Sequence, residues 1–166
     1  QSQKPLLTAI LGNSPYLTRL ITREPARLRL LDGPPDAAFD ALLSRLKEEA
    51  VEARNEAALM AVLRRAKAEA ALLIGAADIA GKWTLEEVTG ALTRFADQAV
   101  SQATDWLLRD AQKNKFIAEL DAEEPAKGTG FLVLAMGKYG AGELNYSSDI
   151  DLVVFFEPGR VSLCEG

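Results

Sequence analysis

The sequence predicts a mainly α-helical protein with a small α+β part near its C-terminal end. Two observations predict this fold class. Apolar residues recur at three- and four-residue steps through most of residues 36–116, as on the buried faces of amphipathic helices. Residues 131–156 instead carry two short apolar runs around a glycine-interrupted polar segment, which is the pattern of a strand, a turn, a short helix and a second strand.

The first 35 residues predict short helices separated by proline and glycine. The apolar stretch from Leu6 to Leu11 is compatible with one helix. Ser14 is a good N-cap, and proline at the next position is typical of a helix start, so a second helix should run from Pro15 to about Arg23. Pro25 would end that helix and permit one further turn, and residues 32–35 break the chain.

A strongly helical pattern begins at Asp36. We expect one long helix, or two with a kink, to reach Leu73 or beyond, with Gly75 and Gly81 as the signals that end it. The apolar positions that carry this pattern are Phe39, Leu42, Leu43, Leu46, Ala50, Ala53, Ala57 and Met60.

A capping box predicts the start of the next helix. Thr84 can cap it while Glu87 reaches back, and Trp83 and Val88 stand at the two positions of a hydrophobic staple. The helix should continue toward Phe116. Its continuous apolar stripe indicates a helix packed in a core rather than a cofactor site.

A polar segment with proline and glycine separates the helical pattern from the strand pattern. We expect a helical region over residues 1–122, a linker over 123–130 and a strand-containing domain over 131–166.

Composition excludes several function classes. The chain has 166 residues, is 48% hydrophobic and carries a net charge of -5, which fits a globular protein. The acidic balance argues against general nucleic-acid binding, so we expect no DNA partner. No apolar run approaches the ~20 residues that a membrane span needs, and we expect no membrane partner and a cytoplasmic location.

The chain has no histidine and one cysteine, Cys164, which we expect to be an inert thiol. This composition excludes disulfide frameworks, zinc sites of the Cys/His kind and Ser-His or Cys-His catalysis. Carboxylate and metal chemistry remains.

Asp149 and Asp151 are the candidate metal ligands. Alternation along a strand would place them on one face, with their Cα atoms roughly 6.6 Å apart, so that their oxygens could converge on a hard cation such as Mg²⁺. Buried carboxylates are costly unless paired, so they should meet a metal or lie at a strand end open to water. A pair of this kind on a solvated turn is the alternative.

The turn before them is a candidate phosphate site. Gly137 follows the first strand directly, and Gly140 and Gly142 allow a sharp bend that exposes backbone N–H groups to an anion. Lys138 adds a positive charge. A tight connection without a ligand is the alternative.

Polar residues around this turn have supporting roles in the prediction. Ser147 and Ser148 could cap a turn or orient Asp149. Glu143 could pair with Lys138 or support the short helix.

These residues resemble a known family. A glycine turn followed twelve residues later by Asp149-Ile150-Asp151 is similar to the signature of polymerase-β-type nucleotidyltransferases. More narrowly, residues 136–140 and 143–152 resemble the bifunctional glutamine synthetase adenylyltransferase/adenylyl-removing enzymes of bacteria, and residues 14–20 are similar to their N-terminal region. Those enzymes have two such domains, and Asn145 and Ser147 resemble the adenylyl-removing, N-terminal copy.

The resemblance implies a function and a set of site residues. The implied reaction is phosphorolytic removal of AMP from a tyrosine of glutamine synthetase, with phosphate as nucleophile and ADP as product. Asp149 and Asp151 would be catalytic and hold Mg²⁺, and Gly137, Lys138 and Ser148 would bind the nucleotide or phosphate. The implied partners are glutamine synthetase, a PII-type signalling protein, and ATP, ADP and phosphate.

The resemblance also implies that the sheet domain is incomplete. The family uses a third carboxylate on a later strand, and the start at Gln1 and the stop soon after Asp151 suggest a truncated nucleotidyltransferase sheet and a fragment with weak activity or none. Two alternatives remain: another metal-dependent nucleotidyltransferase, or a helical protein-interaction module without catalysis.

Overall fold

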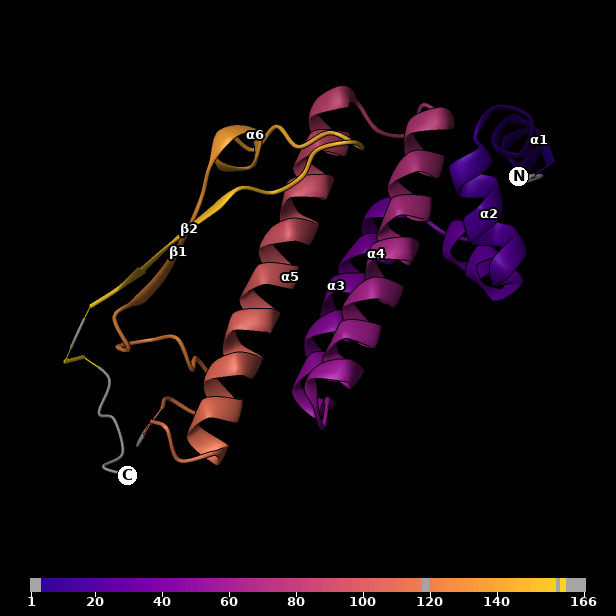
Figure 1. Ribbon diagram of the computed structural model, residues 1–166. Helices are drawn as coiled ribbons and strands as arrows, with labels where there is room; N and C mark the ends of the chain where they lie inside the picture. The colour runs from indigo at the N-terminus through magenta and orange to yellow at the C-terminus, as the bar shows by residue number, and fades with distance from the viewer. Residues whose placement is uncertain (1–3, 118–119, 158, 161–166) are drawn as a thin grey trace.

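The structure is a computed structural model that describes residues 4–117, 120–157 and 159–160. Helices make up most of the described chain, and a two-stranded sheet follows them (Figure 1). The predicted fold class is therefore confirmed. Cys164 lies outside the described residues.

Three short helices form the N-terminal end. They are α1 (Lys4–Asn13), α2 (Pro15–Arg23) and the 3₁₀-helix η1 (Pro25–Leu31). The Ser14 hydroxyl accepts a hydrogen bond from the Leu17 backbone N–H at 3.3 Å, which confirms the predicted cap. Leu17, Ile21 and Leu31 are buried in the main core, so these helices cover one end of the longer helices that follow.

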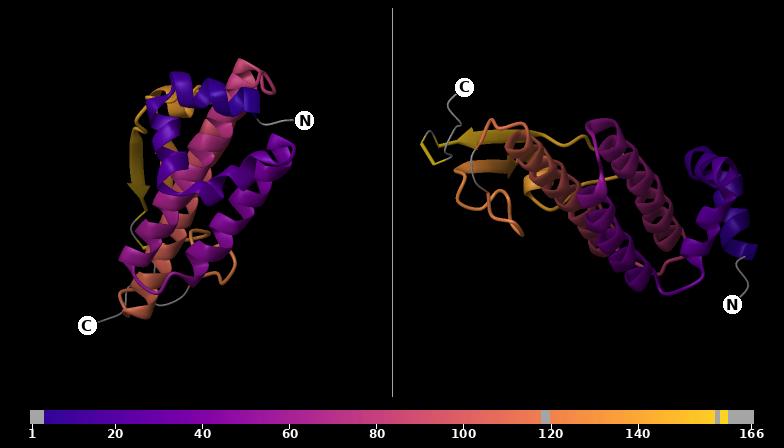
Figure 2. Two further views of the ribbon diagram at one scale, coloured as in Figure 1. Left: turned by 90° about the vertical axis from the view of Figure 1, so that its right-hand side faces the viewer. Right: turned by 90° about the horizontal axis from the view of Figure 1, so that it is seen from below.

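The next region contains two helices that reverse direction. They are α3 (Pro35–Glu52) and α4 (Glu56–Ile79), and they lie side by side (Figures 1 and 2). The expectation of one long helix, or two with a kink, is wrong, because the chain reverses direction between α3 and α4. Ala53 is extended, and Asn55 caps α4 by accepting a hydrogen bond from the Ala58 N–H at 2.9 Å. Both helices need an apolar stripe because they pack against each other. The spacing of apolar residues therefore continues across the turn, and the pattern does not reveal where one helix ends.

The two glycines that were predicted to end this region have different roles. Gly81 has a φ of +60° and follows the end of α4, as predicted. Gly75 lies inside α4, and a Cβ added there would be 3.0 Å from Leu17 Cδ1. It therefore allows α2 to approach α4 closely, and the prediction that it ends the helix is wrong.

The helix α5 (Leu85–Lys113) completes a bundle with α3 and α4. Its predicted capping box is confirmed: the Glu87 carboxylate accepts from the Thr84 N–H at 2.6 Å, and the Thr84 hydroxyl accepts from the Glu87 N–H at 3.3 Å. Trp83 and Val88 are both buried in the main core. In the part of the chain that the structure describes, none of the helices combines the length and apolar character needed to cross a membrane.

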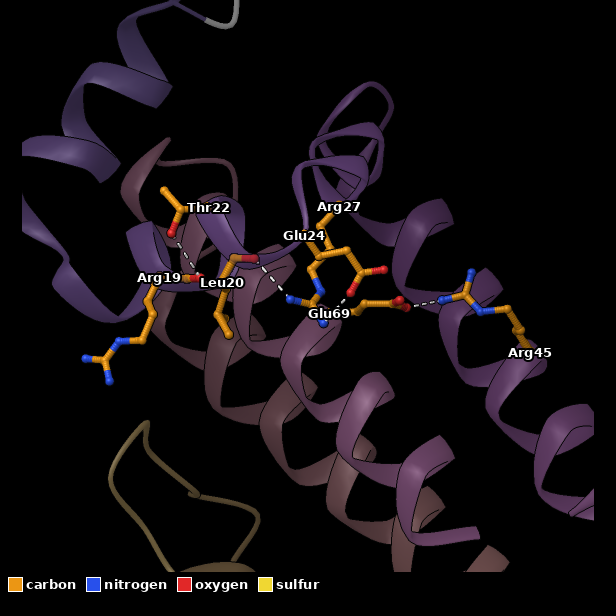
Figure 3. A network of polar contacts seen from close by, with 7 residues as sticks. All are labelled: Arg19, Leu20, Thr22, Glu24, Arg27, Arg45 and Glu69. Atoms are coloured by element: carbon orange, nitrogen blue, oxygen red, sulfur yellow. Dashed lines mark hydrogen bonds and ion pairs between the residues drawn. The ribbon is translucent and has the colours of Figure 1, made fainter. Parts of the chain in front are cut away.

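Polar contacts also join the helices, as Figure 3 shows. Arg45 on α3 forms an ion pair with the buried carboxylate of Glu69 on α4. Nearby in η1, Arg27 donates to the Leu20 carbonyl at 3.0 Å and pairs with Glu24 at 2.8 Å. The first contact joins α3 to α4, and the contacts of Arg27 join η1 to the end of α2.

Residues 120–130, which precede the sheet, form turns and bends and contain no helix. In this segment the Asp121 carboxylate accepts hydrogen bonds from the N–H groups of Glu124 and Glu123, which hold its pKa below the usual range. The strands β1 (Phe131–Ala135) and β2 (Leu152–Phe156) pair antiparallel, with Phe131 opposite Phe156 and Ala135 opposite Leu152. They lie on the side of α5 opposite α3 and α4 (Figures 1 and 2).

The second strand differs from its prediction in two ways. It begins at Leu152, so Asp149 and Asp151 precede the strand instead of sharing a face of it. Its five residues are 38–53% exposed, whereas a buried strand was expected. Among the residues that the structure describes, β2 pairs with β1 and no second layer covers it, so its side chains stay exposed.

Candidate functional site

The glycine turn and the second aspartate meet in space. The Met136 N–H donates to the Asp151 carbonyl at 2.9 Å, which continues the pairing just beyond the sheet. Gly137 follows with a φ of +56°, and a Cβ added to it would lie 3.8 Å from Asp151 Oδ2. The backbone of the predicted phosphate turn therefore lies against the carboxylate of a predicted metal ligand.

A surface recess of about 370 Å³ brings together most of the predicted site residues. Lys138, Ser148, Asp149 and Asp151 all line it, and Gly137 adjoins it through its contact with Asp151. The remaining lining residues are Met136, Tyr139, Asn145 and Ser147. One lysine and two carboxylates thus line the same recess.

A helix of one turn, α6 (Gly137–Gly140), shapes the glycine-turn side of this recess. It begins at the glycine that follows β1, and the first N–H groups of a helix have no acceptor within that helix. Gly140 packs against β1 so closely that a Cβ would lie 2.5 Å from the Ala135 carbonyl oxygen. Gly142, with a φ of +76°, then turns the chain toward the aspartates.

The aspartate side of the recess is a hydrogen-bonded turn. Asn145 Oδ1 accepts from the Ser147 N–H and the Ser148 hydroxyl, both at 3.0 Å, and the Ser148 N–H donates to the Asn145 carbonyl at 3.1 Å. The Ser148 hydroxyl thus takes part in a turn, as predicted, whereas Ser147 joins the turn through its backbone N–H. The hydrogen bonds of the described side chains do not join either serine to Asp149.

Lys138 and Glu143 are joined through the backbone. The Glu143 N–H donates to the Lys138 carbonyl at 2.8 Å. The ion pairs between described residues do not include these two side chains, so the structural support that Glu143 gives to α6 is by its main chain. The Lys138 side chain is exposed and lines the recess.

Sequence reasoning missed Tyr139, which fixes α6 to the helical bundle. Its side chain is 5% exposed and packs with Ala96 and Leu144. Burial, together with the hydrogen bond to Asp97 on α5 and the charge of that carboxylate, raises the pKa of the Tyr139 hydroxyl. A tyrosine between two glycines of a turn is the only signal in the sequence that points to it.

Sequence reasoning also missed Tyr146, which lies just before the two serines. Its hydroxyl donates to Asp78 Oδ2 at 2.8 Å, and Asp78 belongs to the last turn of α4. Burial of the hydroxyl and the Asp78 carboxylate raise the pKa of Tyr146. The hydroxyl therefore remains a donor at neutral pH.

The recess offers oxygen ligands, which are the kind that a hard cation prefers. Asp149 and Asp151 supply carboxylate oxygens, and Asn145 and Ser147 supply neutral oxygens nearby. Hard cations such as Mg²⁺ prefer oxygen ligands. Across the described ranges, no group of three or more aspartate, glutamate, histidine or cysteine side chains gathers in a metal-binding arrangement. The recess thus offers a pair of charged ligands.

Comparisons with known proteins match nearly the whole chain. The family model described as glutamate-ammonia ligase adenylyltransferase matches residues 5–163. Proteins named bifunctional glutamine synthetase adenylyltransferase/adenylyl-removing enzyme are similar to the chain. One from Bradyrhizobium sp. is 48% identical over 96% of this chain, and one from Rhodopseudomonas palustris is 50% identical over 91%. These matches cover 16% and 15% of the relatives, so the chain spans about a sixth of their length.

Proposed function

The chain belongs to the glutamate-ammonia ligase adenylyltransferase family, and from this premise we propose that it is part of an enzyme that acts on AMP-modified glutamine synthetase. We assign it to the half that removes AMP. The likeness of Asn145 and Ser147 to the adenylyl-removing copy of the motif supports this assignment. The reaction is phosphorolysis: a phosphate oxygen attacks the adenylyl phosphorus, the bond to the tyrosine oxygen breaks, and ADP and the free tyrosine result.

The contact between Gly137 and Asp151 carries this proposal. A phosphate held by a backbone turn and a carboxylate that binds metal must be neighbours if they act on the same phosphoryl group. The 3.8 Å between the Cβ position of Gly137 and Asp151 Oδ2 meets that requirement. The pairing of β1 with β2 brings these two residues together.

The predicted site residues each have a part in the proposed mechanism. Asp149 and Asp151 would hold Mg²⁺, which supplies polarisation of the adenylyl phosphate and stabilises the leaving tyrosine oxygen. Gly137 presents backbone N–H groups to a phosphate, and the Lys138 ammonium group balances its charge. Ser148 keeps the turn of Asp149 closed through its bonds with Asn145.

The proposed partners follow from the reaction. They are glutamine synthetase, inorganic phosphate and the nucleotides ADP and ATP, with regulation by a PII-type signalling protein in the cytoplasm. We expect the 166-residue chain by itself to bind Mg²⁺ weakly and to turn over poorly, because two carboxylates form an incomplete ligand set. Robust release of ADP from adenylylated glutamine synthetase by this chain would contradict that expectation.

The test uses the complete protein that carries these residues. Asp149→Asn and Asp151→Asn each retain size and remove one charge, and we expect each to abolish phosphate-dependent release of ADP from adenylylated glutamine synthetase. Binding of glutamine synthetase should be unchanged. Asp40→Asn is the control, because Asp40 lies on α3 in an exposed ion pair with Arg94.

Two other results would favour the alternatives. Unchanged ADP release with weakened binding of glutamine synthetase would support a helical protein-interaction module. A different nucleotidyltransferase would be supported by two results together. The unsubstituted protein would have no activity toward glutamine synthetase, and the two aspartate variants would lose a metal-dependent nucleotidyl transfer to another acceptor.

A further inference from the structure

We propose that Asp78 is a positioning residue that holds the Asp149 turn in place through the hydroxyl of Tyr146. The inference rests on the proposed role of Asp149 as a metal ligand. It makes the end of α4 part of the active-site support.

The contact joins two parts of the chain that are 68 residues apart. The Tyr146 hydroxyl donates to Asp78 Oδ2 at 2.8 Å, and Tyr146 is three residues before Asp149. Asp78 belongs to the last turn of a 24-residue helix whose neighbouring residues Ala76 and Ala77 are buried in the core. The acceptor therefore belongs to a helix that packs in the main core.

The turn that Tyr146 belongs to is closed by hydrogen bonds. Asn145 and Ser148 are joined by three hydrogen bonds, two from the Ser148 and Asn145 backbone N–H groups and one from the Ser148 hydroxyl. A displacement of Tyr146 would therefore be passed on to the residues that follow Ser148, of which Asp149 is the first.

The turn has few other restraints. Leu144, which is buried against Ala96 and Tyr139, holds its beginning. On its other side, β2 is exposed along its whole length. With little packing to hold it, a hydrogen bond to a charged acceptor is a large share of what fixes the turn.

A similar contact holds the opposite side of the recess. Tyr139 on α6 bonds with Asp97 on α5. The glycine turn and the aspartate turn are thus each held by a tyrosine that reaches a carboxylate of the bundle. The separation between Gly137 and Asp149 then depends on the spacing of α4 and α5.

The experiment measures metal binding directly, with Mn²⁺ as the probe and electron paramagnetic resonance as the readout, in the complete protein. We expect Tyr146→Phe and Asp78→Ala each to weaken Mn²⁺ binding about three- to tenfold, which corresponds to the net contribution of one typical hydrogen bond. The kcat for ADP release should fall by a similar factor, while KM for adenylylated glutamine synthetase should not change.

Conservative and matched variants complete the test. Asp78→Asn keeps an oxygen acceptor and should retain most of the Mn²⁺ affinity. The double variant Tyr146→Phe/Asp78→Ala should be no worse than either single variant, because the two residues act through one contact. Tyr16→Phe is the control: Tyr16 is 51% exposed against 54% for Tyr146, and it lies on α2.

The outcomes separate this inference from the proposed function. The positioning role would be overturned if Tyr146→Phe had the same Mn²⁺ affinity and kcat as Tyr16→Phe, even if Tyr146→Phe had a lower melting temperature. Asp149→Asn serves as the reference for the proposed function. If it binds Mn²⁺ as well as the unsubstituted protein does, the metal role of Asp149 is wrong and the inference falls with it.

Discussion

A methyl group added to Gly140 would lie 2.5 Å from the carbonyl oxygen of Ala135. Contacts this short do not occur between real side chains and backbone, so either α6 or β1 would have to move. Glycine at this position lets the one-turn helix lie directly against the strand. That close approach in turn brings Gly137 beside Asp151.

We therefore predict that Gly140→Ala separates α6 from β1. The strain of overpacking should raise the free energy of this region by about 1–3 kcal/mol. The Met136 N–H, which donates to the Asp151 carbonyl, should lose protection from hydrogen exchange by a factor of about five or more. Amide exchange measured by NMR at Met136 and Glu143 checks this prediction.

Gly90→Ala is the matched control for that experiment. Gly90 lies inside α5, and a Cβ added there meets nothing within 4 Å. Alanine should stabilise the helix by up to about 1 kcal/mol and leave exchange at Met136 unchanged. Equal exchange at Met136 in both variants would show that the contact of Gly140 with Ala135 is not needed.

Local sequence signals were sufficient for the starts of α2 and α5. Ser14 and Thr84 were predictable as caps because capping depends on residues within one turn of each other. The turn at Ala53–Asn55 was not predictable in the same way. Ala53 fits the apolar spacing of α3, and one asparagine is a weak signal in an otherwise helical pattern.

The site likewise contains contacts that the local sequence indicates and contacts that it does not. The contact of Gly137 with Asp151 follows from two short strands joined by a turn, so the motif alone indicated it. The contacts of Tyr139 with Asp97 and of Tyr146 with Asp78 depend on where α4 and α5 lie relative to the turn. No pattern within the motif contains that information. The exposure of β2 was missed because an apolar run indicates a strand without specifying what covers it.

Two ion pairs between α3 and α4 should differ in their effect on stability. Arg45 and Arg65 are equally exposed, at 43% and 42% of their side chains, but their partners are not: Glu69 is 12% exposed and Glu49 is 33%. Arg45→Met leaves a nearly buried carboxylate without its cation, so it should cost about 1–2 kcal/mol more than Arg65→Met. Urea unfolding of both variants measures the difference, and equal costs would contradict the prediction.

The close approach of α2 to α4 predicts a coupling between Gly75 and Leu17. In the unsubstituted protein, Gly75→Ala gains helix propensity but places a Cβ 3.0 Å from Leu17 Cδ1, so the two effects oppose each other. Leu17→Ala removes a buried side chain and should cost about 2–5 kcal/mol. In that background Gly75→Ala should stabilise the protein, because the crowding has gone.

A double-mutant cycle measures this coupling. The free energies of unfolding of the two single variants and of the double variant should depart from additivity by about 1 kcal/mol. Strict additivity would mean that Leu17 moves aside at no cost and that Gly75 is present for another reason.

The buried hydroxyl of Tyr139 predicts how stability changes at alkaline pH. Burial and the Asp97 carboxylate raise the pKa of Tyr139 above its ordinary value of about 10. Above pH 10 the unfolded chain has lost the Tyr139 proton while the folded protein retains it, so the folded state binds more protons and stability falls as pH rises. The fall due to this residue should approach 1.4 kcal/mol per pH unit.

Tyr139→Phe isolates that contribution from other groups that titrate in the same range. We expect its free energy of unfolding, measured with urea between pH 8 and pH 11, to fall less steeply above pH 10 than that of the unsubstituted protein. Tyr16→Phe, on the exposed side of α2, should show the same slope as the unsubstituted protein. A slope for Tyr139→Phe equal to that of Tyr16→Phe would mean that the Tyr139 hydroxyl titrates alike in both states, because only a difference in proton binding between the folded and unfolded states changes stability with pH.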